Sequence, residues 1–197
     1  MLEDTPDAKV RGGFYLRLFT QEANGEDKGE ITIARNLFDS KRMNFQNVIV
    51  GEMRDGQTAM RATDVAMMTS GLFSSTIHAI TPEKMIKVYV NMLRSAPERP
   101  SEEYAVDLFA TSFQQLIAIE LEKENEQDDS PRKPRITAIA EVVGSNGNKV
   151  EWRPVFEWEY STGTVRFNGL SKRMVERAHK YKVAIPPELQ EPGVENL

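Results

Sequence analysis

Cysteine is absent from this sequence of 197 residues, and histidine occurs only twice, as His78 and His179. Without cysteine the chain cannot form a disulfide framework or a zinc site built on thiolates. The absence also fits a protein that resides in a reducing cytoplasm.

Long apolar runs and an excess of positive charge are missing as well. No stretch approaches the roughly 18 apolar residues of a membrane-spanning helix, and the N-terminus lacks the basic-then-apolar order of a signal peptide. The formal net charge of -5, from 25 Lys and Arg against 30 Asp and Glu, argues against a mainly electrostatic grip on nucleic acid or anionic lipid, although local basic patches remain compatible with it. With 40% hydrophobic residues, the chain can bury one core and a small satellite domain.

The first half of the chain alternates between patterns typical of strands and helices. A polar loop over 39–47 precedes a short apolar strand at 48–50, and alanine and methionine at helical spacing predict a helix over 58–70. A β-branched run predicts a strand at 73–77. Thr81 and Pro82 are typical of a helix start, and the spacing predicts a helix that extends to residue 94.

After a proline-containing break, Ser101 is a candidate cap for a long helix. The expected buried side of this helix is Tyr104, Leu108, Phe109, Leu116 and Ile117. The segment 120–134 is almost wholly charged or polar and carries no periodicity, which predicts a linker or the tip of a hairpin.

The pattern then changes to a period of two residues, which is typical of strands. Extended segments at 136–143 and 150–160 flank Asn146-Gly147, a strong hairpin signal. A strand at 164–167 and a helix at 171–181 follow. The aromatic residues of the second segment share one parity and are interpreted as packing rather than as a platform for bases: Trp152, Phe156, Trp158 and Tyr160.

Glu52 follows the apolar strand 48–50 directly, after Gly51. In an open α/β sheet, ligands bind beyond the carboxyl ends of the strands, so Glu52 is expected to project into a site. The alternative is an ordinary strand end whose polar residues meet water.

Four motifs in a fixed order resemble the ATPases of type II and type IV secretion and pilus biogenesis. Gly51-Glu52-Met53-Arg54-Asp55 resembles their Walker B segment, and Thr76-Ile77-His78 resembles the end of their histidine box. The segment 2–7, Leu-Glu-Asp-Thr-Pro-Asp, is similar to their aspartate box. The segment 136–144 is similar to their Val-Thr-Glu-Val-Val-Gly segment and is most like the tight-adherence branch. The resemblance runs from Leu2 to about Pro187.

The sequence departs from this family in two places. No Gly-x-x-x-x-Gly-Lys-Ser/Thr occurs in it, so the resemblance implies a C-terminal part without the Walker A loop. The histidine box usually opens with Thr-Gly-His, whereas Thr69-Ser70-Gly71 stands here and one of the two histidines is missing.

The resemblance implies an α/β fold. Residues 1–95 are expected to form part of a RecA-like ATPase core, with the aspartate box, Walker B and the histidine box. Residues 96–134 are expected to form a helix and a polar linker. Residues 135–197 are expected to form a small subdomain of an antiparallel β-hairpin and a helix.

Site roles also come from the resemblance. Glu3 is assigned to activation of the attacking water and Glu52 to the hydration shell of Mg²⁺, although the two could share both duties. Thr76 and His78 are expected to bind ATP, with His78 at the γ-phosphate, and the alternative for His78 is a structural histidine. Arg54 and Asp55 are expected to hold the Walker B turn. Any of four arginines is a candidate to reach a neighbouring subunit's nucleotide, the alternative being a solvated or pairing role: Arg11, Arg17, Arg35 and Arg42.

The expected function is therefore part of an ATP-hydrolysing motor that powers pilus assembly or protein secretion. The expected partners are other copies of the chain in a hexameric ring and a platform protein of the inner membrane, with the motor peripheral at its cytoplasmic face and no nucleic acid bound. A non-catalytic assembly or regulatory module of such a ring is the alternative, because the phosphate-binding loop is missing. A DNA-packaging or conjugation motor is a third reading, to which the acidic balance gives little support.

Overall fold

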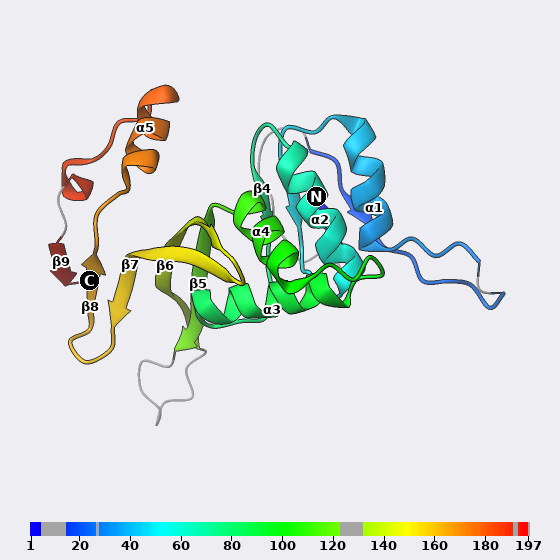
Figure 1. Cartoon of the computed structure of the whole chain (residues 1–197), viewed down its shortest axis with the longest axis horizontal. Helices are drawn as coiled ribbons and strands as arrows, with labels where there is room; N and C mark the ends of the chain where they lie inside the picture. The colour runs from blue at the N-terminus through cyan, green and yellow to red at the C-terminus, as the bar shows by residue number, and fades with distance from the viewer. Residues whose placement is uncertain (5–14, 27, 123–131, 191–192, 197) are drawn as a thin grey trace. The chain divides into compact units, whose positions relative to one another are not determined.

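A computed structural model describes residues 1–4, 15–26, 28–122, 132–190 and 193–196 (Figure 1). The chain divides into two compact units. Unit 1 comprises Met1–His78, Met85–Phe113 and Gly144–Val150, and unit 2 comprises Ala79–Lys84, Gln114–Val143 and Glu151–Leu197. Among the described residues, no helix is long and apolar enough to cross a membrane.

Unit 1 contains a parallel sheet of four strands in the order β2-β1-β3-β4. In chain order its elements are β1 (Leu2–Glu3), β2 (Leu18–Phe19), α1 (Ile33–Ser40), the 3-10 helix η1 (Lys41–Met43), β3 (Val48–Val50), α2 (Gly56–Met68), β4 (Phe73–Ser75), α3 (Pro82–Ser95) and α4 (Glu102–Ser112). The expected strand at 48–50 and the helix starting at Pro82 are confirmed, and the expected helix over 58–70 is confirmed as α2.

Side-chain caps fix where these helices begin. Asp55 accepts a hydrogen bond from the Thr58 backbone N–H at 2.8 Å and starts α2, while Ser101 accepts one from the Tyr104 N–H at 3.2 Å and starts α4. Each cap pairs one of the backbone donors that a helix start leaves unpaired.

The core of unit 1 contains an aromatic cluster contributed by helices α3 and α4. Tyr89 is almost completely buried and packs edge-on against Phe109 and Phe113, with ring centroids 5.4 and 4.9 Å away. Its hydroxyl donates to the Ala59 carbonyl at 2.8 Å, so the one polar atom of the ring is paired. Burial raises the pKa of Tyr89 far above that of a solvated tyrosine.

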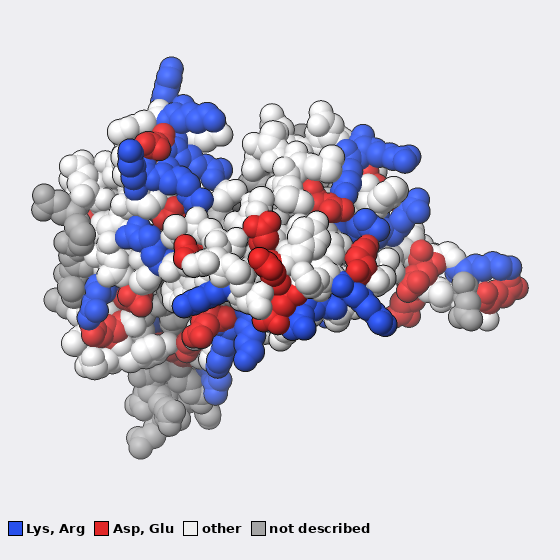
Figure 2. Space-filling model, viewed as in Figure 1, with Lys and Arg blue, Asp and Glu red and all other residues white. Residues whose placement is uncertain are grey.

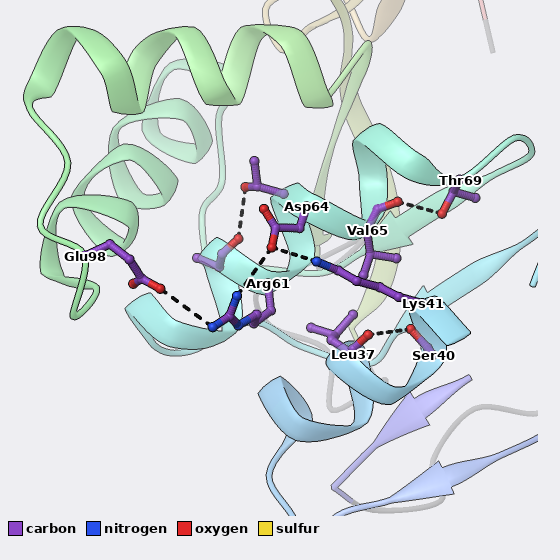
Figure 3. Close-up of polar contacts among 10 residues, drawn as sticks. Leu37, Ser40, Lys41, Arg61, Asp64, Val65, Thr69 and Glu98 are labelled. Atoms are coloured by element: carbon purple, nitrogen blue, oxygen red, sulfur yellow. Dashed lines mark hydrogen bonds and ion pairs between the residues drawn. The ribbon is translucent and has the colours of Figure 1, made fainter. Parts of the chain in front are cut away.

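Ion pairs run along the outer side of α2 (Figure 3). Lys41 and Arg61 both point to Asp64, at 2.7 and 3.5 Å, and Arg61 also approaches Glu98 at 3.8 Å. The network thus joins α2 to η1 and to the connection between α3 and α4.

Unit 2 contains a five-stranded sheet in the order β5-β6-β7-β8-β9. Its elements are β5 (Gln115–Glu122), β6 (Lys133–Asn146), β7 (Lys149–Glu159), β8 (Thr164–Phe167), α5 (Lys172–Lys180), the 3-10 helix η2 (Pro187–Leu189) and β9 (Gly193–Asn196). The expected hairpin is confirmed, since β6 and β7 are joined at Gly147, whose φ of 59° suits a tight turn. The buried positions of β7 are Val150 and Val155, and the aromatic stripe beside them is half-buried or exposed.

The expected continuation of the helix after Ser101 is wrong. Helix α4 ends at Ser112, and Leu116 and Ile117 lie in β5. Buried and exposed residues alternate from Gln115 to Ile119, which is the period of a strand and not of a helix. The structure also contains a helix, α1, that the sequence did not predict. It begins before the segment 39–47, which was expected to be a loop, and ends inside that segment.

Candidate functional site

Three parallel strands of unit 1 end at one edge of their sheet. Leu2 of β1 is in register with Val50 of β3, and Val50 is in register with Ser75 of β4. Because the strands run in the same direction, the residues that follow them lie at a common carboxyl edge, which is where open α/β sheets place ligands. Asp4, Glu52 and His78 follow these three strands.

Glu52 is the centre of the contacts at this edge. Its Oε2 accepts hydrogen bonds from Arg54 Nε at 2.7 Å, and Arg54 NH2 lies 2.5 Å away. Its Oε1 lies 2.7 Å from His78 Nε2, but the pair lacks the alignment of a hydrogen bond, and Oε1 is buried without such a partner among the described residues. The Glu52 side chain is 18% exposed and that of His78 is 93% exposed. Oε2 of Glu52 is therefore the oxygen that hydrogen bonds to Arg54, and Oε1 is the oxygen that faces His78.

Arg54 sets the ionisation of this carboxylate. The hydrogen bond from Arg54 lowers the pKa of Glu52; burial opposes this effect, and the charges of Arg54 and His78 add to it. The same contact raises the pKa of Arg54. Arg54 also reaches Asp4, at 3.6 Å. The pKa of Glu52 is thus lower than that of a solvated glutamate, which is itself an anion at neutral pH.

Two hydrogen bonds join the residues that follow β3 and β4 at this edge. Thr76 Oγ1 donates to the Gly51 carbonyl at 2.6 Å, and the Met53 N–H donates to the Thr76 carbonyl at 3.0 Å. The Thr76 hydroxyl therefore bonds to the chain in this structure, and it fixes the turn that carries Glu52. Its role toward a nucleotide stays a prediction.

Glu3 has a different environment from Glu52. It is 3% exposed, and its Oε2 accepts from Arg17 Nε and NH2 at 3.0 and 2.7 Å. Asp4, the residue after Glu3, is the one whose carboxylate lies near the Glu52–Arg54 pair. The sequence interpretation did not assign Asp4, although its position directly after β1 is the same signal that selected Glu52.

The remaining candidates make local contacts. Asp55 caps α2 and also accepts from the Thr58 hydroxyl at 2.6 Å, so it anchors the segment after Glu52. Arg35 pairs with Asp39 at 2.9 Å, and Arg42 lies over the Phe38 ring at 5.6 Å. Arg11 lies outside the described residues. Nothing in these contacts selects one arginine as the residue that acts on a neighbouring subunit.

No protein-family model and no curated protein matches this sequence. Solved structures do match it. The VirB11 ATPase of the Brucella suis type IV secretion system, in complex with sulphate, aligns with a TM-score of 0.51 and 19% identity over 70% of this chain and 38% of its own. The pilus retraction motor PilT with bound ADP aligns with a TM-score of 0.48 and 21% identity, over 74% of this chain and 38% of its own.

The chain therefore spans 38% of the length of each of these proteins. The likeness to VirB11 concerns the fold. It confirms the expected α/β class, with one parallel and one antiparallel sheet.

Proposed function

We propose that this chain is part of an ATP-hydrolysing motor that powers pilus assembly or protein secretion. The observation that carries the proposal is the Glu52 carboxylate beyond β3, held by Arg54 and in contact with an exposed histidine from the end of the next strand. The fold that it shares with the VirB11 ATPase supports the choice of chemistry.

The residues at this edge fit Mg²⁺ held through water. In the part of the chain that the structure describes, no three or more His, Cys, Asp or Glu side chains gather as a metal cluster. Glu52 Oε1, buried without a hydrogen-bond partner among the described residues, suits a donor such as metal-bound water. When bound with ATP, Mg²⁺ would supply positive charge that offsets the negative charge developing on the phosphoryl group.

Glu52 takes the central role in this proposal. As an anion whose Oε1 has no hydrogen-bond partner among the described residues, it would accept a hydrogen bond from a water. Glu3 is the weaker candidate for a base, since two guanidinium N–H groups already engage its Oε2. The exposed His78 ring would supply a donor to the terminal phosphate if a nucleotide bound at this edge.

A second candidate function is a non-catalytic module that joins or regulates such a motor. It is favoured by the absence of a Gly-x-x-x-x-Gly-Lys loop from these 197 residues, because that loop supplies the backbone N–H cradle and the lysine for the phosphates.

Steady-state phosphate release by the complete protein tests the first function. Glu52→Gln keeps the shape of the side chain and removes its charge, so we expect kcat to fall on the order of 10²-fold or more while ATP binding is retained. The matched control is Glu151→Gln, an exposed glutamate of β7, which should turn over at the wild-type rate. Unchanged turnover in Glu52→Gln excludes this assignment, and absence of turnover in the wild type favours the module.

A further inference from the structure

Helix α5 of unit 2 is attached to its sheet without a single buried residue. Its apolar side chains Met174, Val175 and Ala178 are only half-buried, whereas α4 of unit 1 buries five residues. The segment 172–182 carries five Lys or Arg against a single acid. In Figure 2, Lys and Arg side chains gather where Figure 1 places α5. Burial of apolar surface thus contributes little to the docking of this helix.

A buried carboxylate holds the first turn of α5 instead. Glu141 of β6 has a side chain that is 4% exposed, and its Oε1 accepts hydrogen bonds from Ser171 Oγ at 2.8 Å and from Arg173 Nε at 3.1 Å. Arg173 NH2 also donates to the Val142 carbonyl at 2.7 Å. Two donors of α5 and its cap therefore depend on one charge inside the sheet.

The contact farther along the helix is weaker. Arg177 donates to the side chain of Gln114 at 2.7 Å, and both residues are exposed. A hydrogen bond to a neutral amide in water contributes less than a charged pair at a buried position. The docking of α5 thus depends chiefly on Glu141.

The chain just before α5 is anchored separately from the helix. The Asn168 N–H donates to the Val155 carbonyl at 2.9 Å, and Arg153 donates to the carbonyls of Asn168 and Gly169 at 3.0 Å each. Gly169 has a φ of 85°, a region that glycine enters at little cost, and Ser171 follows two residues later. A rotation between Gly169 and Ser171 therefore moves the helix and leaves the bonds of Asn168 in place.

Both ends of α5 are closed by its own residues. Ser171 Oγ accepts from the Met174 N–H at 3.1 Å, and at the other end Lys182 has a φ of 55° and the Val183 N–H donates to the Ala178 carbonyl at 2.8 Å. These ends need no partner from the sheet. A helix of nine residues is nevertheless marginal in water by itself, so protection of its backbone reports docking.

We propose that α5 is a releasable helix, which the charge of Glu141 holds on the sheet and which leaves it about Gly169 while the strands stay paired. Release exposes the buried carboxylate and frees Arg173 and Arg177. An anion that binds these arginines competes with Glu141, so it shifts the population toward the released state. The inference goes beyond the proposed motor function and needs no nucleotide.

Hydrogen exchange of the 197-residue chain in increasing urea, read by mass spectrometry, tests the release. In the wild type, α5 amides should exchange about tenfold or more faster than those of β6, at rates that change little with urea, because the release of one helix exposes little surface. Glu141→Gln keeps the shape of the side chain and removes its charge, so α5 exchange should accelerate on the order of tenfold or more. The β6 amides should stay slower than those of α5 and keep a stronger dependence on urea.

Salt gives a second measurement of the same contact. Sodium chloride at about 1 M should accelerate α5 exchange in the wild type and have a smaller effect in Glu141→Gln, because the charge that salt screens is then missing. An equal effect of salt on the two proteins would overturn the role of Glu141.

Glu159→Gln is the matched control, because it also removes a carboxylate paired with an arginine of unit 2, Arg166 at 3.0 Å, and it should leave α5 exchange unchanged. If Glu141→Gln fails to fold by circular dichroism, Arg173→Gln replaces it with the same expected acceleration, since it removes the half-exposed end of the same contact. One shared rate and urea dependence for α5 and β6 in the wild type overturns the proposal, because α5 then leaves only when the sheet unfolds. Unchanged α5 exchange in the test variant, or equal acceleration in the control, also overturns it.

Discussion

Two glutamates, one in each compact unit, are held by arginine and keep one buried carboxylate oxygen without a hydrogen-bond partner among the described residues. Glu141 lies inside β6, its side chain is 4% exposed, and it takes hydrogen bonds from Ser171 and Arg173 of the α5 start. Glu52 lies beyond β3 at the end of a parallel strand, and its second oxygen faces an exposed histidine.

The difference between the two lies in where the partners come from. The partners of Glu141 connect β6 to β7 and to the start of α5. Ser171 and Arg173 come from the start of α5. Arg153 of β7 lies 3.7 Å from Glu141 and also donates to the carbonyls of Asn168 and Gly169, which precede α5. The partners of Glu52 lie beyond the strand ends of the parallel sheet, where Arg54 also reaches Asp4. We therefore interpret Glu141, inside a strand, as a structural contact between elements. We interpret Glu52, beyond a strand end, as part of a candidate site.

After Glu52→Gln, the largest expected effect comes from His78, which tests whether Glu52 and its neighbours act on a bound ligand. In the complete protein, His78→Ala should lower kcat on the order of 10²-fold, because a donor to the phosphates is lost, while ATP binding is nearly retained. The free energy of unfolding should change by no more than about 0.5 kcal/mol, since the side chain is almost fully exposed.

Turnover and thermal unfolding measured on the same His78→Ala preparation separate the two interpretations of this residue. His78→Gln retains a donor and should recover part of the rate, and Asn91→Ala, an exposed change on α3, should leave both quantities unchanged. A stable His78→Ala protein with wild-type turnover would remove the phosphate role. Loss of stability without nucleotide would favour the structural alternative.

The second effect is on stability and concerns Glu141. Glu141→Gln should lower the free energy of unfolding by about 1–3 kcal/mol, because the charge that binds Ser171 and Arg173 is removed from a buried position. Glu52→Gln should change the free energy of unfolding by no more than about 0.5 kcal/mol, because Glu52 lies beyond the end of β3 and not inside a strand. Urea unfolding of both variants measures the difference, and equal losses would show that Glu52 is also a structural tie.

Much of this contrast could be predicted from local patterns. The apolar run 48–50 followed by Glu52 indicated a strand end with a projecting carboxylate, and the contact with His78 adds a second group from the next strand. Asn146-Gly147 indicated the hairpin, because few residue pairs suit that turn.

The rest depended on tertiary contacts that no local pattern contains. Leu116 and Ile117 suit either a helix or a strand by composition, and pairing of β5 with β6 decides for the strand. The tie at Glu141 joins residues about thirty positions apart, and Asp4 reaches Arg54 only because β1 and β3 are neighbours. Spacing along the chain does not report such distances.

The smallest expected effect concerns the pH dependence that Arg54 gives to Glu52. A carboxyl whose pKa is lower in the folded protein stabilises the fold above its unfolded pKa of about 4.3, and this contribution is lost as the pH falls through the folded pKa. Arg54→Gln removes the largest cause of the lowering. We therefore expect the Glu52 pKa to rise and the melting temperature to depend less on pH in the acidic range.

Carbon-detected NMR titration of the Glu52 carboxyl, with melting temperatures recorded from neutral pH to about pH 3, measures both quantities. Arg166→Gln is the matched control, because Arg166 pairs with Glu159 at 3.0 Å between β8 and β7 of unit 2, away from Glu52 in the sequence and in the other compact unit. It should leave the Glu52 titration unchanged. If Arg54→Gln also leaves it unchanged, the hydrogen bond from Arg54 does not lower the pKa of Glu52 in solution. In Arg54→Gln, a higher Glu52 pKa together with lower turnover of the complete protein at mildly acidic pH would show that Arg54 keeps Glu52 ionised for turnover. No arginine around Glu141 is expected to affect turnover in this way.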